Sequence, residues 1–159
     1  MRKFSEKFVD FYNGSWYSER KKEKVVLTDN FKKLKMTEIK YIHEPTDLQC
    51  GQAVLAMVLD KSVDEIIEYL GNERETNLKE MKSALRHFGV NISDERIPVS
   101  SKKELPELCL LSLETPRCWH WSLYCRGIFF DPEHGVMDDF PISNRRYYWK
   151  LSKKQSVFA

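Results

Sequence analysis

The sequence predicts an α+β domain in which helices come first and an antiparallel sheet follows. Two observations favour this class. Apolar residues recur at helical spacing between residues 51 and 88, whereas short apolar or alternating runs typical of strands fill residues 108–151. Helices and strands that are segregated in this way along a chain are typical of α+β folds.

The composition indicates one soluble, globular domain. A chain of 159 residues, with 42% hydrophobic and 13% aromatic residues, is long and apolar enough to bury a substantial core. The net charge of +2 is too balanced to favour nucleic-acid binding, although basic runs occur at residues 18–24 and 32–35. We therefore expect a single domain over residues 1–159 and no nucleic-acid partner.

Membrane insertion and cofactor binding are not expected. No apolar stretch approaches the roughly 20 residues of a transmembrane helix, and the N-terminus lacks the pattern of a signal peptide. Four unevenly spaced cysteines without a Cys-x-x-Cys pair favour a reducing compartment over a disulfide framework. The protein is expected to be cytoplasmic, or exported without a signal peptide. A zinc site built from Cys118, His120 and His134 is possible but lacks the usual paired spacing, so no metal or cofactor is expected.

The first forty residues predict an extension with two helices. Phe4, Phe8, Phe11 and Tyr12 lie at helical spacing and favour an N-terminal helix over residues 1–13. A charged run at residues 18–24 is typical of a solvated surface. A short strand at residues 25–27 and a helix over residues 31–40 are expected to follow.

Three further helices are predicted after a turn at residues 44–47. The first runs from Gly51 to Leu59. The second starts with a capping box at Ser62 and ends near Gly71, with Ile66, Ile67 and Leu70 on its buried face. The third is capped at residues 76–77, carries Leu78, Met81, Leu85 and Phe88 at helical spacing, and ends at Gly89. His87 is interpreted as a structural residue at the end of this third helix.

Three strand segments complete the domain. Residues 108–113 form an apolar run that predicts a central strand. Residues 120–131 predict a β-hairpin that turns at Arg126-Gly127, and residues 147–151 have the high β propensity of a final strand. Cys109 and Cys125 fall in such apolar runs and are expected in the core, whereas Cys118 is expected in a loop, partly exposed.

Cys50 is the candidate nucleophile. It lies where a polar loop gives way to an apolar, helix-forming run. The free N–H groups and the positive dipole end of a helix N-terminus stabilise a thiolate over a thiol. The alternative is a buried cysteine that acts as a small hydrophobic residue.

His120 is the candidate base, and Asp131 is its expected partner. In a hairpin centred on Arg126-Gly127, residues 121–122 face residues 131–132, so His120 and Asp131 lie close together with a small diagonal offset. A carboxylate that fixes the tautomer of a histidine produces the base that a cysteine nucleophile needs. His134 and the Asp138-Asp139 pair are weaker rivals.

Two tryptophans flank the candidate base. Strand alternation places Trp119 and Trp121 on the face opposite His120. Either one could still form the wall of a cleft, and the alternative is that both are ordinary core or surface aromatics.

These residues together resemble the papain-like cysteine peptidases. The helix-opening Cys-Gly-x-Ala-x-Leu-Ala-Met at residues 50–57, the strand that carries His120 and the second strand that ends in Asp131-Pro132 are most similar to the bacteriocin-leader (double-glycine) peptidase-like group. The resemblance covers about residues 43–135 and implies a papain-like fold, with residues 1–40 as an N-terminal extension. It implies that Cys50 is the nucleophile, His120 the general acid/base and Asp131 the residue that orients the histidine.

The sequence departs from this family at one position. The family usually carries a glutamine six residues before the cysteine, and its amide helps to hold the oxyanion. Glu44 occupies that position here, and an ionised carboxylate can only accept hydrogen bonds. Gln49 adjoins Cys50, so its side chain is expected to point elsewhere, and the Cys50 backbone N–H could supply one donor.

The expected activity is that of a thiol hydrolase that cleaves peptide or amide bonds in a peptide or protein substrate. An acyltransferase or a deamidase would use the same triad, because only the acceptor or the substrate group changes. The competing class is a protein-binding module that kept the scaffold but lost catalytic efficiency, and Glu44 favours it. The sequence leaves the substrate specificity and the oligomeric state open.

Overall fold

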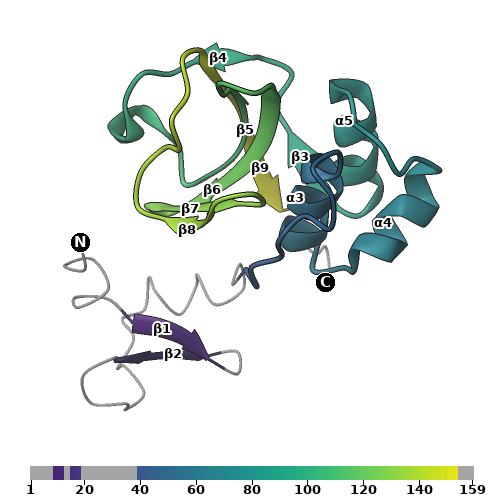
Figure 1. Ribbon diagram of the computed structural model, residues 1–159, viewed down its shortest axis with the longest axis horizontal. Coiled ribbons are helices and arrows are strands. Elements are labelled where there is room, and N and C mark those ends of the chain that lie inside the picture. The colour runs from purple at the N-terminus through teal and green to yellow at the C-terminus, as the bar shows by residue number, and fades with distance from the viewer. Residues whose placement is uncertain (1–8, 13–14, 19–38, 154–159) are drawn as a thin grey trace, which may run out of the picture. The chain divides into compact units, whose positions relative to one another are not determined.

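A computed structural model describes residues 9–12, 15–18 and 39–153, and it divides the chain into two compact units, Met1–Lys40 and Tyr41–Ala159 (Figure 1). The prediction of one papain-like domain with an N-terminal extension stays a prediction.

The first unit contains a small antiparallel hairpin. Strand β1 (Val9–Tyr12) pairs with β2 (Ser15–Ser18), and Tyr12 lies opposite Ser15. The predicted helix over residues 1–13 is therefore wrong at residues 9–12. The Asn-Gly pair at positions 13–14 of the sequence strongly favours a two-residue hairpin connection, and this signal outweighed the helical spacing of the aromatic residues.

The other predictions for the extension fall almost wholly outside the described residues. These are the solvated run at residues 18–24, the strand at residues 25–27 and the helix over residues 31–40. Of that last helix, only residues 39–40 are described, and they are not helical.

Three helices in the second unit confirm the predicted helical half. They are α3 (Cys50–Leu59), α4 (Val63–Leu70) and α5 (Leu78–His87). Capping boxes open α4 at Ser62 and α5 at Asn77, in each case with a glutamate that reaches back to the N-cap backbone. Gly71 adopts a left-handed conformation with φ 67° and ends α4, as predicted. On the predicted buried face of α4, only Ile66 is fully buried.

A seven-stranded sheet follows the helices. Its strands are β3 (Val90–Ile92), β4 (Ile97–Pro98), β5 (Leu108–Glu114), β6 (Trp119–Cys125), β7 (Ile128–Asp131), β8 (Gly135–Met137) and β9 (Arg146–Lys153). The order is β3-β9-β5-β6-β7-β8, and β4 also pairs with β9. The predicted strand at residues 108–113 is β5, and it is central because β6 and β9 flank it. The short strands β3, β4 and β8 were not predicted.

The β6–β7 hairpin confirms the predicted turn. Cys125 pairs with Ile128, which leaves Arg126 and Gly127 as a two-residue connection. Both have positive φ angles, 45° and 91°, as a primed hairpin turn requires. The turn therefore fixes the register that brings the end of β7 beside the start of β6.

The sheet buries both of its faces. On one face, Trp121 packs against Trp149 with ring centroids 5.8 Å apart, and α3 packs against β6 on this side. On the other face, a second core contains Cys109, Leu111, Leu113, Tyr124 and Phe129. Figure 1 shows the helices gathered on one side of the second unit and the curved sheet on the other. The start of α3 thus meets the sheet at β6, where the candidate base lies.

Candidate active site

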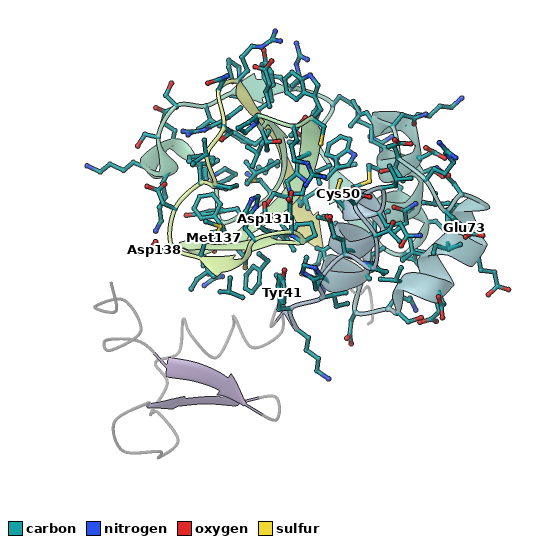
Figure 2. All side chains as sticks on the ribbon, viewed as in Figure 1. Tyr41, Cys50, Glu73, Asp131, Met137 and Asp138 are labelled. Carbon is teal, nitrogen blue, oxygen red and sulfur yellow. The ribbon has the colours of Figure 1, made fainter. Side chains whose placement is uncertain are left out.

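Cys50 is the first residue of α3 and is half-buried. The N-cap residue, Gln49, does not cap the helix with its side chain, because its amide instead donates to the carbonyl oxygen of Glu73 at 3.1 Å. The Gln49 side chain thus points away from Cys50, as expected. The backbone N–H of Trp121 donates to the Cys50 Sγ at 3.5 Å, a contact that stabilises negative charge on sulfur. Figure 2 places Cys50 where the helices meet the sheet, with Asp131 on the sheet side.

His120 and Asp131 form a buried pair. His120 Nε2 lies 3.0 Å from Asp131 Oδ1 and 3.1 Å from Oδ2, and the two residues are only 4% and 0% exposed. Burial lowers the pKa of His120, but interactions with Asp131 and Cys50 outweigh it and raise this pKa to about 10. Burial also acts to raise the pKa of Asp131, yet hydrogen bonds and charge from His120 hold it well below its usual range. Both shifts favour an ion pair of an imidazolium and a carboxylate.

Further donors surround the Asp131 carboxylate. The Ser122 hydroxyl donates to Oδ2 at 2.8 Å, and the backbone N–H groups of Glu133 and His134 each lie 3.0 Å from Oδ1. His134 Nδ1 also contacts Oδ1 at 2.9 Å. Ser122 was missed in the sequence, although its position two residues after His120 places both side chains on the same face of β6. This network fixes the carboxylate, and the carboxylate in turn fixes the imidazole.

The structure brings together the three residues singled out in the sequence. Asp131 contacts the His120 ring, and a ring nitrogen of His120 lies within 4.8 Å of the Cys50 sulfur. A carboxylate oxygen of Glu44 lies within the same distance of both. The rivals do not replace these residues. His134 sits in the turn after Asp131 and binds the carboxylate, and Asp138 and Asp139 are exposed.

His87 and the other three cysteines lie where the sequence places them. His87 stacks on Tyr69 with ring centroids 4.5 Å apart, as a structural residue of α5 would. Cys109 and Cys125 are buried, and Cys118 is exposed.

Glu44 lies beside Cys50 and His120. It is 6% exposed, and among the described residues its Oε1 has no hydrogen-bond partner. Its backbone N–H donates to the Pro132 carbonyl at 2.9 Å, and the hydroxyl of Tyr41 donates to the Asp131 carbonyl at 2.6 Å. These two bonds attach the segment before α3 to the end of β7. Burial raises the pKa of Glu44 above its ordinary value, and the charges of Glu133 and Asp131 add to this, although His120 opposes it.

A cleft of about 410 Å³ opens beside Cys50 and His120. Trp119 and Trp121 line it together with Cys50 and His120, so the tryptophans form its wall even though strand alternation directs them to the other face. Trp121 is held by its indole N–H, which donates to the Thr76 carbonyl at 3.0 Å. At the rim, Arg117 lies 3.4 Å from Asp47 and 3.1 Å from Glu133.

Two groups of metal-capable side chains occur in the described part of the chain. They are Glu44, Cys50 and His120, and His120, Glu133 and His134. Cys118 belongs to neither, so the set weighed in the sequence does not assemble. Both groups use His120, whose Nε2 already contacts Asp131.

Among helices in the described residues, none is both long enough and apolar enough to cross a membrane.

Comparisons with known proteins bear on the fold. No family model and no curated protein matches this sequence. Among solved structures, the chain is similar to the crystal structure of a double-glycine motif protease from an AMS/PCAT transporter in complex with the leader peptide. The two share 18% sequence identity with a TM-score of 0.54, and the match covers 73% of this chain and 94% of that one. This likeness confirms the papain-like α+β fold that the sequence resemblance implies.

Proposed function

We propose that the protein is a thiol hydrolase that cleaves peptide or amide bonds, with Cys50 as nucleophile, His120 as general acid/base and Asp131 as the residue that orients His120. The observation that carries this proposal is that the His120 imidazole lies close to both Asp131 and Cys50. His120 contacts the buried Asp131 at 3.0 Å, and the same ring lies within 4.8 Å of the Cys50 sulfur. This is the nucleophile, base and orienting group that covalent catalysis by cysteine requires.

The reaction follows from these positions. The Cys50 sulfur bonds to the carbonyl carbon, and the electron pair of the carbonyl moves onto its oxygen. His120 gives its proton to the leaving nitrogen as the C–N bond breaks. Water then gives a proton to His120 and bonds to the acyl carbon, and the C–S bond breaks to restore the thiolate.

The substrate class is proposed from the cleft and from the structural neighbour. The cleft beside Cys50 is open and carries two tryptophans, and aromatic walls suit an extended peptide. The neighbour was crystallised with a leader peptide. We therefore assign a peptide or protein substrate. Acyl transfer or side-chain deamidation would use the same triad with a different acceptor or target group.

One observation favours a second candidate, a protein-binding module with impaired catalysis. Glu44 stands where the resembled family has a glutamine that helps to hold the oxyanion, and an ionised carboxylate would repel that charge. The binding module and the hydrolase differ in the reactivity of Cys50, because only the hydrolase needs an ion-paired thiolate.

Alkylation with iodoacetamide at pH 6 separates these candidates. Labelling is located by mass spectrometry, so that the exposed Cys118 serves as a reference thiol in the same molecule. The hydrolase predicts that Cys50 reacts faster than Cys118 and that His120→Ala abolishes the difference. Equal labelling rates of Cys50 and Cys118 that do not change in His120→Ala would favour the binding module. The His134→Ala variant tests the rival base, and loss of fast labelling there but not in His120→Ala would reverse the assignment.

A further inference from the structure

We propose that Glu44 is the side-chain donor of the oxyanion hole and that it acts as a neutral carboxylic acid. This inference rests on the proposed function, and it assigns a catalytic role to Glu44, which otherwise favours a protein-binding module over a hydrolase. Only the protonated acid has an O–H group to donate. Acylation of the Cys50 thiolate is therefore expected to require protonated Glu44.

Position is the first support. A carboxylate oxygen of Glu44 lies within 4.8 Å of both the Cys50 sulfur and a ring nitrogen of His120. The oxyanion of a tetrahedral adduct is two bonds from the sulfur, and a donor belongs about 2.7–3.1 Å from that oxygen. The carboxyl group of Glu44 is therefore within reach of the oxyanion.

The backbone around Glu44 is fixed by the strand that carries the triad carboxylate. The Glu44 N–H donates to the Pro132 carbonyl at 2.9 Å, and the Tyr41 hydroxyl donates to the Asp131 carbonyl at 2.6 Å. Figure 2 shows Tyr41 beneath the same region of the sheet. A donor held in this way needs little reorganisation when charge develops on the substrate.

Burial without partners favours the neutral form. Glu44 is only 6% exposed, its Oε1 accepts no hydrogen bond from any described residue, and no ion pair to Glu44 occurs in the described part of the chain. An ionised carboxylate in such surroundings loses hydration, and the positive charges of His120 and His43 offset only part of that cost. A protonated acid avoids this cost and keeps a donor for a ligand.

The charges that face Glu44 act on its pKa in both directions. From its own segment, His43 is exposed and favours ionisation weakly. From β6, the His120 imidazolium also favours it, whereas Asp131 of β7 and Glu133 of the following turn oppose it. On α3, a Cys50 thiolate would add another negative charge. Burial is the largest effect, and the net result of burial and these charges is a raised pKa of Glu44.

The chemical step balances without moving a proton from Glu44. The Cys50 sulfur bonds to the carbonyl carbon, the oxygen takes the electron pair, and the Glu44 O–H donates a hydrogen bond to that oxygen. When the tetrahedral adduct collapses, the C=O bond forms again and Glu44 keeps its proton. Carboxylic acids that are kept neutral by their surroundings can fill this role.

The test compares two reagents on Cys50 of the full-length protein across pH 4–9. Iodoacetamide alkylates sulfur by displacement and forms no oxyanion. p-Nitrophenyl acetate acylates sulfur through a tetrahedral oxyanion and releases p-nitrophenolate. Both adducts at Cys50 are quantified by mass spectrometry. The ratio of the acylation rate to the alkylation rate cancels the thiolate fraction and isolates the oxyanion hole.

The wild-type ratio is expected to be high at acidic pH and to fall about tenfold per pH unit above the pKa of Glu44. Glu44→Gln keeps a donor at every pH, so its ratio is expected to be flat and to exceed the wild-type ratio at high pH, by at most about a hundredfold to a thousandfold. Glu133→Gln is the matched control. It removes an equal charge near His120 from a residue paired with Arg117 at 3.1 Å. Because the Glu133 charge raises the pKa of Glu44, the fall in the ratio should begin at a lower pH in this variant but should remain as steep as in the wild type.

A wild-type ratio that does not change with pH, or a Glu133→Gln ratio that flattens as the Glu44→Gln ratio does, would overturn the inference while His120-dependent alkylation still supported the hydrolase. If instead Cys50 reacts with iodoacetamide no faster than Cys118 at pH 6, the proposed function itself fails and the inference falls with it.

Discussion

His120 Nε2 lies 3.0 Å from Asp131 Oδ1, although the two residues belong to different strands and are both almost fully buried. The pairing of Leu123 with Phe130 places Ser122 opposite Asp131, and His120 two residues further along β6. One turn at Arg126-Gly127 therefore sets the distance between base and carboxylate. The same pair contributes to stability and to the proposed chemistry.

Asp131→Ala is expected to destabilise the protein by about 3–5 kcal/mol. The substitution leaves the buried His120 and the Ser122 hydroxyl without their acceptor, and it removes the acceptor for two backbone N–H groups. Urea unfolding followed by tryptophan fluorescence measures the loss. Asp138→Ala removes an exposed carboxylate and should change stability by no more than about 0.5 kcal/mol. Equal losses in the two variants would show that the buried network contributes nothing.

Stability is expected to fall as the pH rises from 6.5 toward 10. The contacts with Asp131 and Cys50 raise the pKa of His120 from 6.5 to about 10 despite burial, so the folded protein holds this proton more tightly than the unfolded chain. This stabilisation is complete below pH 6.5 and is lost as the pH approaches 10, at no more than about 1.4 kcal/mol per pH unit. The contribution of Asp131 to stability changes with pH in the opposite direction. Its lowered pKa adds stability above about pH 4 that is lost on acidification.

Urea unfolding at fixed pH values between 6.5 and 8.5 isolates the contribution of His120. Above about pH 8.5 the buried Cys109, whose pKa burial also raises, begins to ionise in the unfolded chain and adds its own slope. Asp131→Asn removes the charge that holds the His120 proton, so its stability should decline less in this window. A slope unchanged by Asp131→Asn would mean that another group causes the decline.

Ser122→Ala is expected to cost about 1.5–3 kcal/mol, the usual range for a hydrogen bond to a charged group. Ser122 is fully buried, and its hydroxyl donates to Asp131 Oδ2 at 2.8 Å. Because Ser122 acts through Asp131, the variant should also change the pKa of His120, which NMR titration of the imidazole measures. Ser152→Ala on the exposed side of β9 is the control. A stability loss without a change in the His120 titration would limit Ser122 to packing.

Local signals explain how much of the fold could be predicted. The capping boxes at Ser62 and Asn77 and the turn at Arg126-Gly127 depend on residues within a few positions, and all three were found where the sequence places them. That turn also predicted that His120 and Asp131 would be neighbours. Their approach to Cys50 needed the resemblance to a known family, because 70 residues separate Cys50 from His120.

The missed features depend on partners in other strands. Strand β4 has two residues and exists because β9 pairs with it, so no local periodicity could reveal it. Ser122 is distinguished from other strand serines only by its hydrogen bond to Asp131 on the neighbouring strand. The burial of Glu44 results from the end of β7, which holds its backbone through Pro132. In the first unit, the helical spacing of the aromatic residues wrongly predicts a helix, whereas the Asn-Gly pair at positions 13–14 of the sequence favours a hairpin.

Gly51→Ala is expected to destabilise the protein by about 1–3 kcal/mol, although alanine normally favours a helix. A Cβ at this position in α3 would overlap the Thr76 Oγ1 and would lie 3.1 Å from Trp121 Cδ1. The backbone of the residue that follows Cys50 would have to move, so fast alkylation of Cys50 should also be reduced. Urea unfolding and iodoacetamide labelling measure both effects.

The double variant Gly51→Ala/Thr76→Ala tests the cause of this effect. Removal of the Thr76 hydroxyl takes away the overlapping atom, so the double variant should recover part of the stability that Gly51→Ala loses, relative to Thr76→Ala alone. Additive losses would mean that the hydroxyl is not the obstacle. Recovery of stability together with Cys50 reactivity would show that the close approach of α3 to Thr76 positions the nucleophile.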